Sequence, residues 1–185
     1  MSIIVAGVTG LVGSALSREL SRRGVDHIGI STKNVDLLDR NATFDFFQTH
    51  KPELVIDAAA KTGGIQANNS MPVDFLSINT RIQTNIFDAC HSAKVKRLVF
   101  LGSSCIYPRD CAQPIKEEFL LSGPLEATNS AYAVAKISGI EGIKSYRRQY
   151  NHHWISLMPT NLYGPCDNFD LESSHVIAEI GRAHV

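Results

Sequence analysis

The sequence lacks three features that would each point to a whole class of protein. It has no excess of charge, because 18 Lys and Arg residues balance 18 Asp and Glu residues, so charge does not suggest a nucleic-acid or membrane partner. It has no apolar run as long as a membrane span. Its four cysteines form no CxxC pair and no disulfide-scaffold spacing, which favours reduced thiols in the cytoplasm. The N-terminal MSIIVAGVTG has no basic start or cleavage-site pattern, so we expect a strand there rather than a signal peptide.

The sequence does contain a regular alternation of short apolar runs and amphipathic segments. It predicts strands at residues 2–6, 27–30, 54–56, 98–101 and 154–157, and helices at residues 11–23, 42–48, 75–90 and 131–150. This order indicates an α/β fold of the Rossmann type, with a doubly wound parallel sheet covered by helices on both faces. Because right-handed crossovers bring the carboxyl ends of all strands to one edge, we expect one crevice there. The residues expected to line it are Gly7, Ala58, Gly102 and Pro159.

A glycine-rich loop joins the first strand to the first helix with the spacing GxxGxxG. Glycine permits positive φ and lets the backbone approach a pyrophosphate, and the following helix N-terminus offers free N–H groups to that anion. An ordinary strand-to-helix turn is the alternative, but the position in the first βαβ unit favours nucleotide binding. The expected cofactor contacts are Gly7, Val8, Thr9, Gly10, Leu11, Val12 and Gly13.

The end of the second strand bears on the choice of cofactor. NAD sites usually place a carboxylate here for the ribose 2′-hydroxyl, whereas this chain has Ser31, Thr32 and Lys33. Lys33 would attract a 2′-phosphate, so we expect NADP, although a solvated surface loop is the alternative. Asp39 is placed either to contact the adenine side of the cofactor or to cap the helix that starts near Asn41.

Tyr132 and Lys136 lie four residues apart near the start of a long predicted helix, so they share one of its faces. A fixed ammonium should lower the pKa of the phenol, which could then exchange a proton with a carbonyl oxygen near neutral pH. The strand-end hydroxyl of Ser103 is the natural group to orient that carbonyl. YxxxK alone also arises by chance on solvated helices, but a glycine loop, a strand-end serine and YxxxK in this order do not.

These features resemble the extended short-chain dehydrogenases/reductases that act on nucleotide sugars, and within them the GDP-L-fucose synthase family. The resemblance is carried by GSSCIYP at 102–108, NLYGP at 161–165, DNF at 167–169, SHV at 174–176 and AAAKTGGIQANN at 58–69. It implies NADPH-dependent 3,5-epimerisation and 4-reduction of GDP-4-keto-6-deoxy-D-mannose. It also implies a nucleotide-sugar substrate and a homodimer formed through the long helices, with no nucleic-acid partner, membrane partner or metal.

The resemblance assigns roles to individual residues. Ser103, Tyr132 and Lys136 correspond to the reductase triad, and Cys105 and His175 to the epimerisation pair, with Cys105 as base and His175 as acid. Without the resemblance, Cys105 would be interpreted as a small buried residue and His175 as a surface histidine. Besides the glycine loop, Lys33 and Asp39, the cofactor-contacting positions are Ala58, Ala59, Leu101, Gly102, Ser103, Ser104, Lys136, Pro159, Thr160, Asn161, Leu162 and His175.

We expect residues 1–177 to form the NADP-binding domain, with the substrate region starting near residue 164 and the smaller substrate domain of the family largely missing. Residues 178–185 depart from the family pattern, and residues 179–185 resemble a translated sequencing adapter, so a non-native tail and an inactive fragment are expected. Two alternatives remain. One is another NAD(P)-dependent nucleotide-sugar epimerase or dehydratase, and the other is a non-catalytic NADP-binding module.

Overall fold

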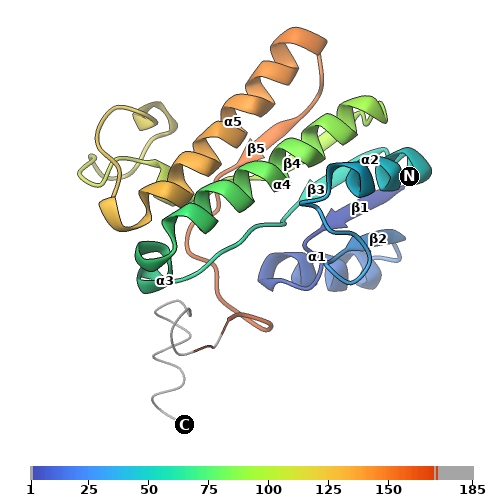
Figure 1. Cartoon of the computed structure of the whole chain (residues 1–185), viewed down its shortest axis with the longest axis horizontal. Coiled ribbons are helices and arrows are strands. Elements are labelled where there is room, and N and C mark those ends of the chain that lie inside the picture. Colours follow the sequence, from blue (N-terminus) through green and yellow to red (C-terminus); the bar gives the residue numbers. More distant parts are fainter. Residues whose placement is uncertain (1, 169, 171–185) are drawn as a thin grey trace.

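A parallel five-stranded sheet forms the centre of the protein in the computed structural model, which describes residues 2–168 and 170. The strands run in the order β2-β1-β3-β4-β5, and every neighbouring pair is parallel (Figure 1). Their bounds are Ile3–Ala6 for β1, His27–Ile30 for β2, Leu54–Asp57 for β3, Arg97–Leu101 for β4 and Ile155–Leu157 for β5. The Rossmann-type sheet expected from the sequence is therefore confirmed.

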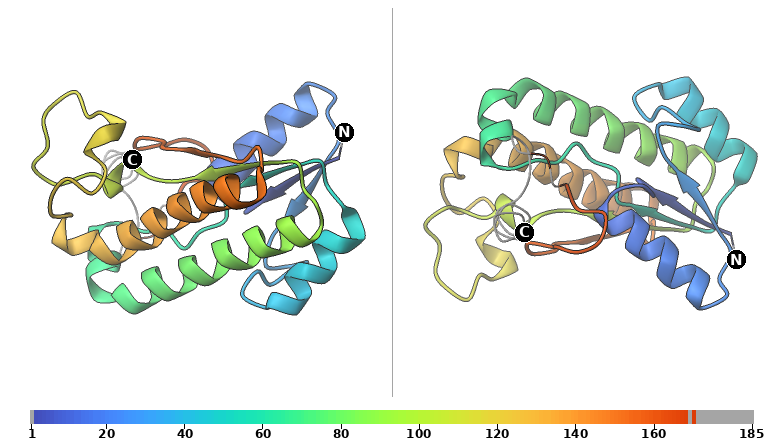
Figure 2. Two further views of the ribbon diagram at one scale, coloured as in Figure 1. Left: turned by 90° about the horizontal axis from the view of Figure 1, so that it is seen from above. Right: turned by 90° about the horizontal axis from the view of Figure 1, so that it is seen from below.

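The helices lie on both faces of this sheet, as the alternating pattern predicted. Helix α1 covers one face, and α2, α4 and α5 cover the other (Figure 2). Their bounds are Leu11–Arg22 for α1, Arg40–His50 for α2, Ile65–Ser70 for α3, Pro72–Ser92 for α4 and Ser130–Tyr150 for α5. Within the described residues, none of them has both the length and the apolar character needed to cross a bilayer.

Buried aromatic side chains fill the space between β4 and the long helices. The Phe87 ring of α4 meets the Phe100 ring of β4 edge-on, with centroids 5.3 Å apart. A Cβ added to Gly139 of α5 would lie 2.5 Å from Cζ of Phe100, so only glycine lets α5 pack this close to the strand. Behind them, the fully buried Trp154 donates its indole N–H to the Val95 carbonyl at 3.2 Å. These contacts fix α5, which carries Tyr132 and Lys136, against the end of β4.

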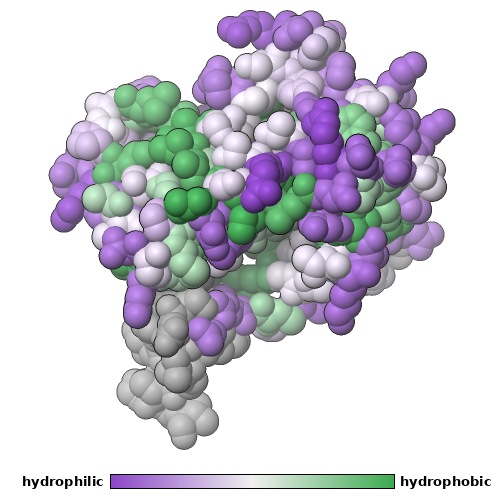
Figure 3. Space-filling model, in the orientation of Figure 1, coloured by the Kyte–Doolittle hydropathy of each residue, from purple (hydrophilic) through white to green (hydrophobic). Residues whose placement is uncertain are grey.

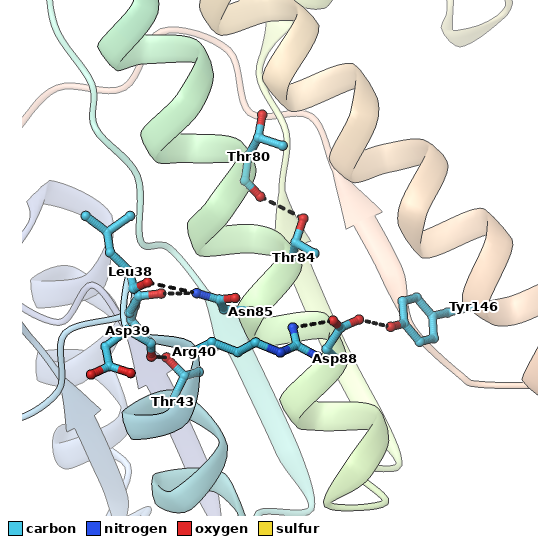
Figure 4. A network of polar contacts seen from close by, with 10 residues as sticks. Leu38, Asp39, Arg40, Thr43, Thr80, Thr84, Asn85, Asp88 and Tyr146 are labelled. Atoms are coloured by element: carbon cyan, nitrogen blue, oxygen red, sulfur yellow. Dashed lines mark hydrogen bonds and ion pairs between the residues drawn. The ribbon is translucent and has the colours of Figure 1, made fainter.

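A polar network ties the segment before α2 to the two long helices (Figure 4). Arg40 forms an ion pair with Asp88 of α4 at 2.6 Å, and the Tyr146 hydroxyl of α5 donates to the same carboxylate. The side-chain amide of Asn85 donates to the carbonyl of Leu38 at 3.3 Å, besides a shorter bond to the preceding carbonyl. The network holds the segment that precedes Asp39 in a fixed position relative to the sheet.

Candidate active site

The carboxyl ends of β1, β3, β4 and β5 meet at one edge of the sheet. The chain turns in opposite directions after β1 and β3, so the topological switch point of the sheet lies between them. The backbone N–H of Ala58 donates to Ala6 at 3.1 Å, and that of Gly102 donates to Leu157 at 2.7 Å. The N–H of Ser104 donates to Pro159 at 3.2 Å. The strand ends expected to share a crevice therefore do lie side by side.

Two of the three loop glycines are required by close backbone packing. Gly7 has φ +78°, and a Cβ there would lie 2.6 Å from the carbonyl oxygen of Ala58. A Cβ on Gly13 would lie 2.0 Å from the carbonyl oxygen of Gly7, whereas one on Gly10 would meet nothing nearer than 3.5 Å. Gly10 precedes α1, and within the described residues no side chain caps this helix. The first-turn N–H groups of α1 are therefore left without a side-chain cap, and such groups can bind an anion.

We expect Gly13→Ala to lower the free energy of unfolding by about 1–3 kcal/mol, because the methyl group overlaps the Gly7 carbonyl. Gly10→Ala is the matched control, since its methyl group has room and its stability should change by less than about 1 kcal/mol. Denaturant titration of both variants measures the difference. Equal stability of the two variants would contradict the packing role of Gly13.

The loop after β2 presents Lys33 to solvent. The Asn34 side chain shapes this loop by accepting from the Ser31 N–H at 2.8 Å and donating to the Gly29 carbonyl at 2.8 Å. Lys33 is exposed at the tip of that turn. Asp39 caps α2, because its carboxylate accepts from the Ala42 N–H at 3.1 Å. Of the two interpretations of Asp39, the structure shows the helix cap, and contact with a cofactor remains a prediction.

Ser103 and Cys105 form a hydrogen-bonded pair just after β4. Ser103 Oγ accepts from the Cys105 thiol at 3.1 Å and from the Cys105 N–H at 3.4 Å. Within the described part of the chain, no acceptor is recorded for the Ser103 hydroxyl hydrogen. That hydrogen is therefore available to a carbonyl oxygen bound in the crevice.

Tyr132 and Lys136 lie on the first two turns of α5 and point toward the same strand end. Nζ of Lys136 donates to the Leu101 carbonyl at 2.8 Å and lies 5.8 Å from the centroid of the Tyr132 ring. The same ammonium lies 4.7 Å from the Phe100 ring centroid. The Tyr132 ring packs edge-on against Phe75 of α4. A hydroxyl, a thiol, a phenol and an amine from two distant segments are thus gathered at one strand end.

We expected the Lys136 ammonium to lower the pKa of Tyr132, and this expectation is wrong. Burial raises the pKa of Tyr132 well above its usual value, and the nearby Cys105 raises it further. Nζ of Lys136 lies over the Tyr132 ring and donates its hydrogen bond to the Leu101 carbonyl rather than to the phenol. Burial also raises the pKa of the Cys105 thiol, with the Ser103 hydrogen bond and Lys136 acting in the opposite direction. Both groups therefore carry their protons at neutral pH.

One ionisable residue of the site was missed in the sequence. Asp57 ends β3 and is 1% exposed, and one of its carboxylate oxygens accepts from the Ala59 N–H at 3.1 Å. Burial raises its pKa from the usual 3.8 to about 6, although Lys136 and the Ala59 hydrogen bond lower it. The only sequence signal was a carboxylate at the end of a strand that is otherwise apolar.

Because the pKa of Asp57 is higher in the folded protein, folding is favoured by protonation. This contribution to stability is complete below about pH 4 and is lost as the pH rises through 6. Relative to Asp57→Asn, the unfolding free energy of the unmodified protein should fall by about 2 kcal/mol between pH 4 and pH 7. Denaturant titrations across this range measure the difference. Parallel pH profiles would show that Asp57 does not titrate in this way.

Buried amides fix the loop that follows β3, and no pattern in the sequence indicated this role. The Asn79 side chain of α4 accepts from the Lys61 N–H at 2.8 Å and donates to the Lys61 carbonyl at 3.0 Å. Asn68 donates to the carbonyls of Gly63 and Gly64. Lys61 itself pairs with Asp74 at 2.7 Å. The loop between β3 and α3 is therefore held by side chains rather than by regular secondary structure.

For the remaining expected cofactor-contacting residues, the structure shows only their positions in the fold. Ala58, Ala59, Leu101, Gly102 and Ser104 lie along the strand ends, as do Pro159 and the exposed positions Thr160, Asn161 and Leu162. His175 lies outside the described residues. Among those that are described, no group of three or more His, Cys, Asp or Glu side chains could hold a metal ion. An open cavity lined by Arg147, Arg148 and His152 lies near the C-terminal end of α5, remote from the crevice.

The comparisons agree with this geometry. Residues 3–184 match the profile of the NAD dependent epimerase/dehydratase family. The chain is 50% identical to a GDP-L-fucose synthase of Sinorhizobium fredii, over 98% of this chain and 58% of that protein. It resembles the Campylobacter jejuni GDP-D-glycero-L-gluco-heptose synthase solved in the presence of NADPH (TM-score 0.93, 36% identity, 98% and 53% covered). It also resembles a GDP-L-fucose synthetase from Naegleria fowleri bound to NADP (TM-score 0.87, 32% identity, 98% and 60% covered).

The chain thus spans slightly more than half the length of the relatives it matches. The family profile covers nearly all of it, from the first strand onward. The glycine-rich loop, the strand-end serine and the tyrosine–lysine pair all lie within that match. The chain therefore belongs to the NAD dependent epimerase/dehydratase family.

Proposed function

We propose that this chain is the NADPH-binding part of an enzyme that converts GDP-4-keto-6-deoxy-D-mannose to GDP-L-fucose. The observation that carries the proposal is the grouping of Ser103, Cys105, Tyr132 and Lys136 at the end of β4. The similarity to GDP-L-fucose synthases supports the same conclusion. The alternative of a non-catalytic NADP-binding module is disfavoured because it would not need this set of groups.

The residues present fit a dinucleotide cofactor. Gly7 and Gly13 let the loop pack tightly against neighbouring backbone, and the absence of a side chain at Gly10 leaves room at the start of α1 where a pyrophosphate would approach. The N–H groups at the start of α1 would hold the pyrophosphate, Lys33 the 2′-phosphate and Lys136 the nicotinamide ribose. When bound, NADPH supplies a hydride to C4 of the sugar.

The chain's own residues would perform the proton transfers. A 4-keto group acidifies the protons at C3 and C5, and we assign their removal to Cys105 once its thiol is ionised. The negative charge that develops on the C4 oxygen would be stabilised by the Ser103 hydroxyl and the Tyr132 phenol. Protonation from the opposite face, which we assign to His175, would invert each centre. In the reduction, the neutral Tyr132 phenol would donate its proton to the C4 oxygen.

The test is NADPH oxidation by a chimera that continues this chain with the C-terminal part of the Sinorhizobium fredii relative. During incubation with GDP-4-keto-6-deoxy-D-mannose and NADPH, the absorbance of NADPH should decrease and GDP-L-fucose should form. Formation of a different 4-epimer, or oxidation only with NADH, would support another nucleotide-sugar enzyme of the same fold. A folded chimera that binds NADPH but turns over no 4-keto sugar would overturn the proposal.

Lys33→Glu should weaken NADPH binding by about tenfold or more, because the new carboxylate repels the 2′-phosphate. Binding of NADH, which lacks that phosphate, should change little. Fluorescence titration of both cofactors measures the ratio of affinities. Lys96→Glu, an exposed lysine just before β4, is the control for a general loss of positive charge. Equal weakening by both substitutions would remove Lys33 from the phosphate site.

We also propose that the protein acts as a homodimer through α4 and α5 in the cytoplasm. Apolar side chains are exposed on these helices, with Val73 and Leu76 of α4 at 73% and 40% and Val134 of α5 at 46%. Figure 3 shows apolar patches over this face and over the segment between β4 and α5. A reduced Cys105, which the proposed chemistry needs, is consistent with the cytoplasm. Sedimentation equilibrium tests the dimer.

A further inference from the structure

Asp57 is a buried carboxylate for which the proposed chemistry has no use. Its Oδ1 accepts from the Ala59 N–H, while Oδ2 is buried without a hydrogen-bond partner. A buried carboxylate without full hydrogen bonding is strongly disfavoured unless an opposite charge is near. The position of Asp57 at the C-terminal end of a central strand therefore calls for a nearby cation.

The sheet register shows where that cation is. Asp57 pairs with Phe100 of β4, so the two side chains project from the same face of the sheet. The Phe100 ring packs against Phe87 of α4 and Gly139 of α5, which identifies this face as the one that α4 and α5 cover. Nζ of Lys136 lies 4.7 Å from the centre of that ring. Asp57 and Lys136 are thus on the same side of the sheet, beside one aromatic side chain.

The other titratable groups near this end of β3 are either neutral or already paired. Helix α4 contributes the Cys90 thiol, whose pKa burial raises well above its usual value. Cys105 and Tyr132 also keep their protons, because burial raises both pKa values. Lys61 is paired with Asp74. Lys136, which is 4% exposed, is therefore the cation that faces Asp57 among the described residues.

Lys136 in turn lacks another strong reason to remain charged. Burial lowers its pKa, and Asp57 is the largest opposing influence, followed by Cys105. Its hydrogen bond goes to the neutral Leu101 carbonyl rather than to a carboxylate. The interaction between Asp57 and Lys136 thus acts through space in a poorly hydrated environment, where charges interact strongly.

We propose that Asp57 is the positioning residue for Lys136, a buried counter-charge that keeps its amine protonated at the strand end. The role rests on the proposed function, in which Lys136 holds the nicotinamide ribose. Without the carboxylate, the amine would be neutral over more of the working pH range. It would then be a weaker hydrogen-bond donor to the ribose and would not favour ionisation of Cys105.

The first test measures the pKa of Lys136 by NMR titration of the 185-residue chain labelled with isotopes at lysine. The Lys136→Met variant identifies the signal of Lys136. In Asp57→Asn, the pKa of Lys136 should fall by about one unit or more, because an opposite charge has been removed. Asp45→Asn, an exposed carboxylate of α2, should leave it unchanged. An unchanged Lys136 pKa in Asp57→Asn would overturn the proposal.

A stability cycle provides a second measurement that does not depend on NMR. Asp57→Asn, Lys136→Met and the double variant are unfolded with denaturant at pH 8, where Asp57 is ionised. Lys136→Met leaves an unpaired buried carboxylate, so adding Asp57→Asn should restore stability. If Asp57→Asn alone does not fold, Asp57→Ala takes its place in the cycle. Additive effects of the two substitutions would refute the pairing.

These results can be separated from those that test the proposed function. A lowered Lys136 pKa in a chain whose chimera turns over no 4-keto sugar would support the positioning role and reject the proposed reaction. An active chimera in which Asp57→Asn leaves the Lys136 pKa unchanged would support the proposed reaction and reject the positioning role. In an active chimera, Asp57→Asn should also move the alkaline limb of NADPH binding to lower pH by the same shift, whereas a merely structural role would leave that limb in place.

Discussion

Tyr132→Phe should reduce the rate of C4 reduction by about 10²–10⁴-fold while leaving NADPH affinity within a few-fold, because it removes only the phenol proton. The raised pKa of Tyr132 makes this expectation sharper, since the phenol is in the protonated form needed to give a proton to the C4 oxygen. Single-turnover NADPH oxidation in the chimera measures the rate, and fluorescence titration measures the affinity. Exchange of the C3 and C5 protons with solvent should fall less than reduction.

Tyr150→Phe is the matched control for this experiment. Tyr150 ends the same helix, and its hydroxyl accepts a hydrogen bond from Gln149 at the surface, far from the strand end. It should change reduction less than about twofold. A Tyr132→Phe enzyme that loses reduction and proton exchange equally would show that the phenol acts on the enolate rather than as the proton donor.

Cys105→Ser should lower deuterium incorporation at C3 of the 4-keto sugar by about 10²–10⁴-fold and leave NADPH binding intact. The serine hydroxyl keeps the size and the hydrogen bond to Ser103, but it does not ionise near neutral pH. Mass spectrometry of the recovered sugar in D₂O measures the exchange. Because burial raises the pKa of Cys105, exchange in the unmodified chimera should increase with pH above neutrality.

Cys111→Ser controls for the loss of a thiol elsewhere in the same loop region. It should exchange deuterium at the rate of the unmodified chimera. Unchanged exchange in Cys105→Ser would exclude Cys105 as the base and leave only its packing role after β4.

The sequence was sufficient to predict the sheet because its signals are local. Four-residue apolar runs such as residues 3–6 and 98–101 have no polar positions and so predict buried strands. Helix α4 was predicted from residue 75, where its apolar stripe begins, but it starts at Pro72, because proline is favoured in the first turn of a helix. Helix α3 was missed because Ile65–Ser70 is short and its stripe is weak.

The chemistry at the strand end was predicted less completely because it depends on how deeply each side chain is buried. Four-residue spacing correctly placed Tyr132 and Lys136 on one face of α5. It gave no information on how much water reaches them, and burial reverses the expected direction of the Tyr132 pKa. Asp57 was not recognised for the same reason, since its burial arises from Phe100 and α4, which are distant in the sequence.

The bond from Lys136 to the Leu101 carbonyl limits what this ammonium can offer a ligand. An ammonium group has three N–H donors, and one is already used on the backbone of β4. Two remain, which matches the vicinal diol of a ribose. An arginine at this position would present a planar fork of donors that cannot reach the carbonyl and a diol in the same way. The strand carbonyl therefore favours lysine over arginine at this point of the helix.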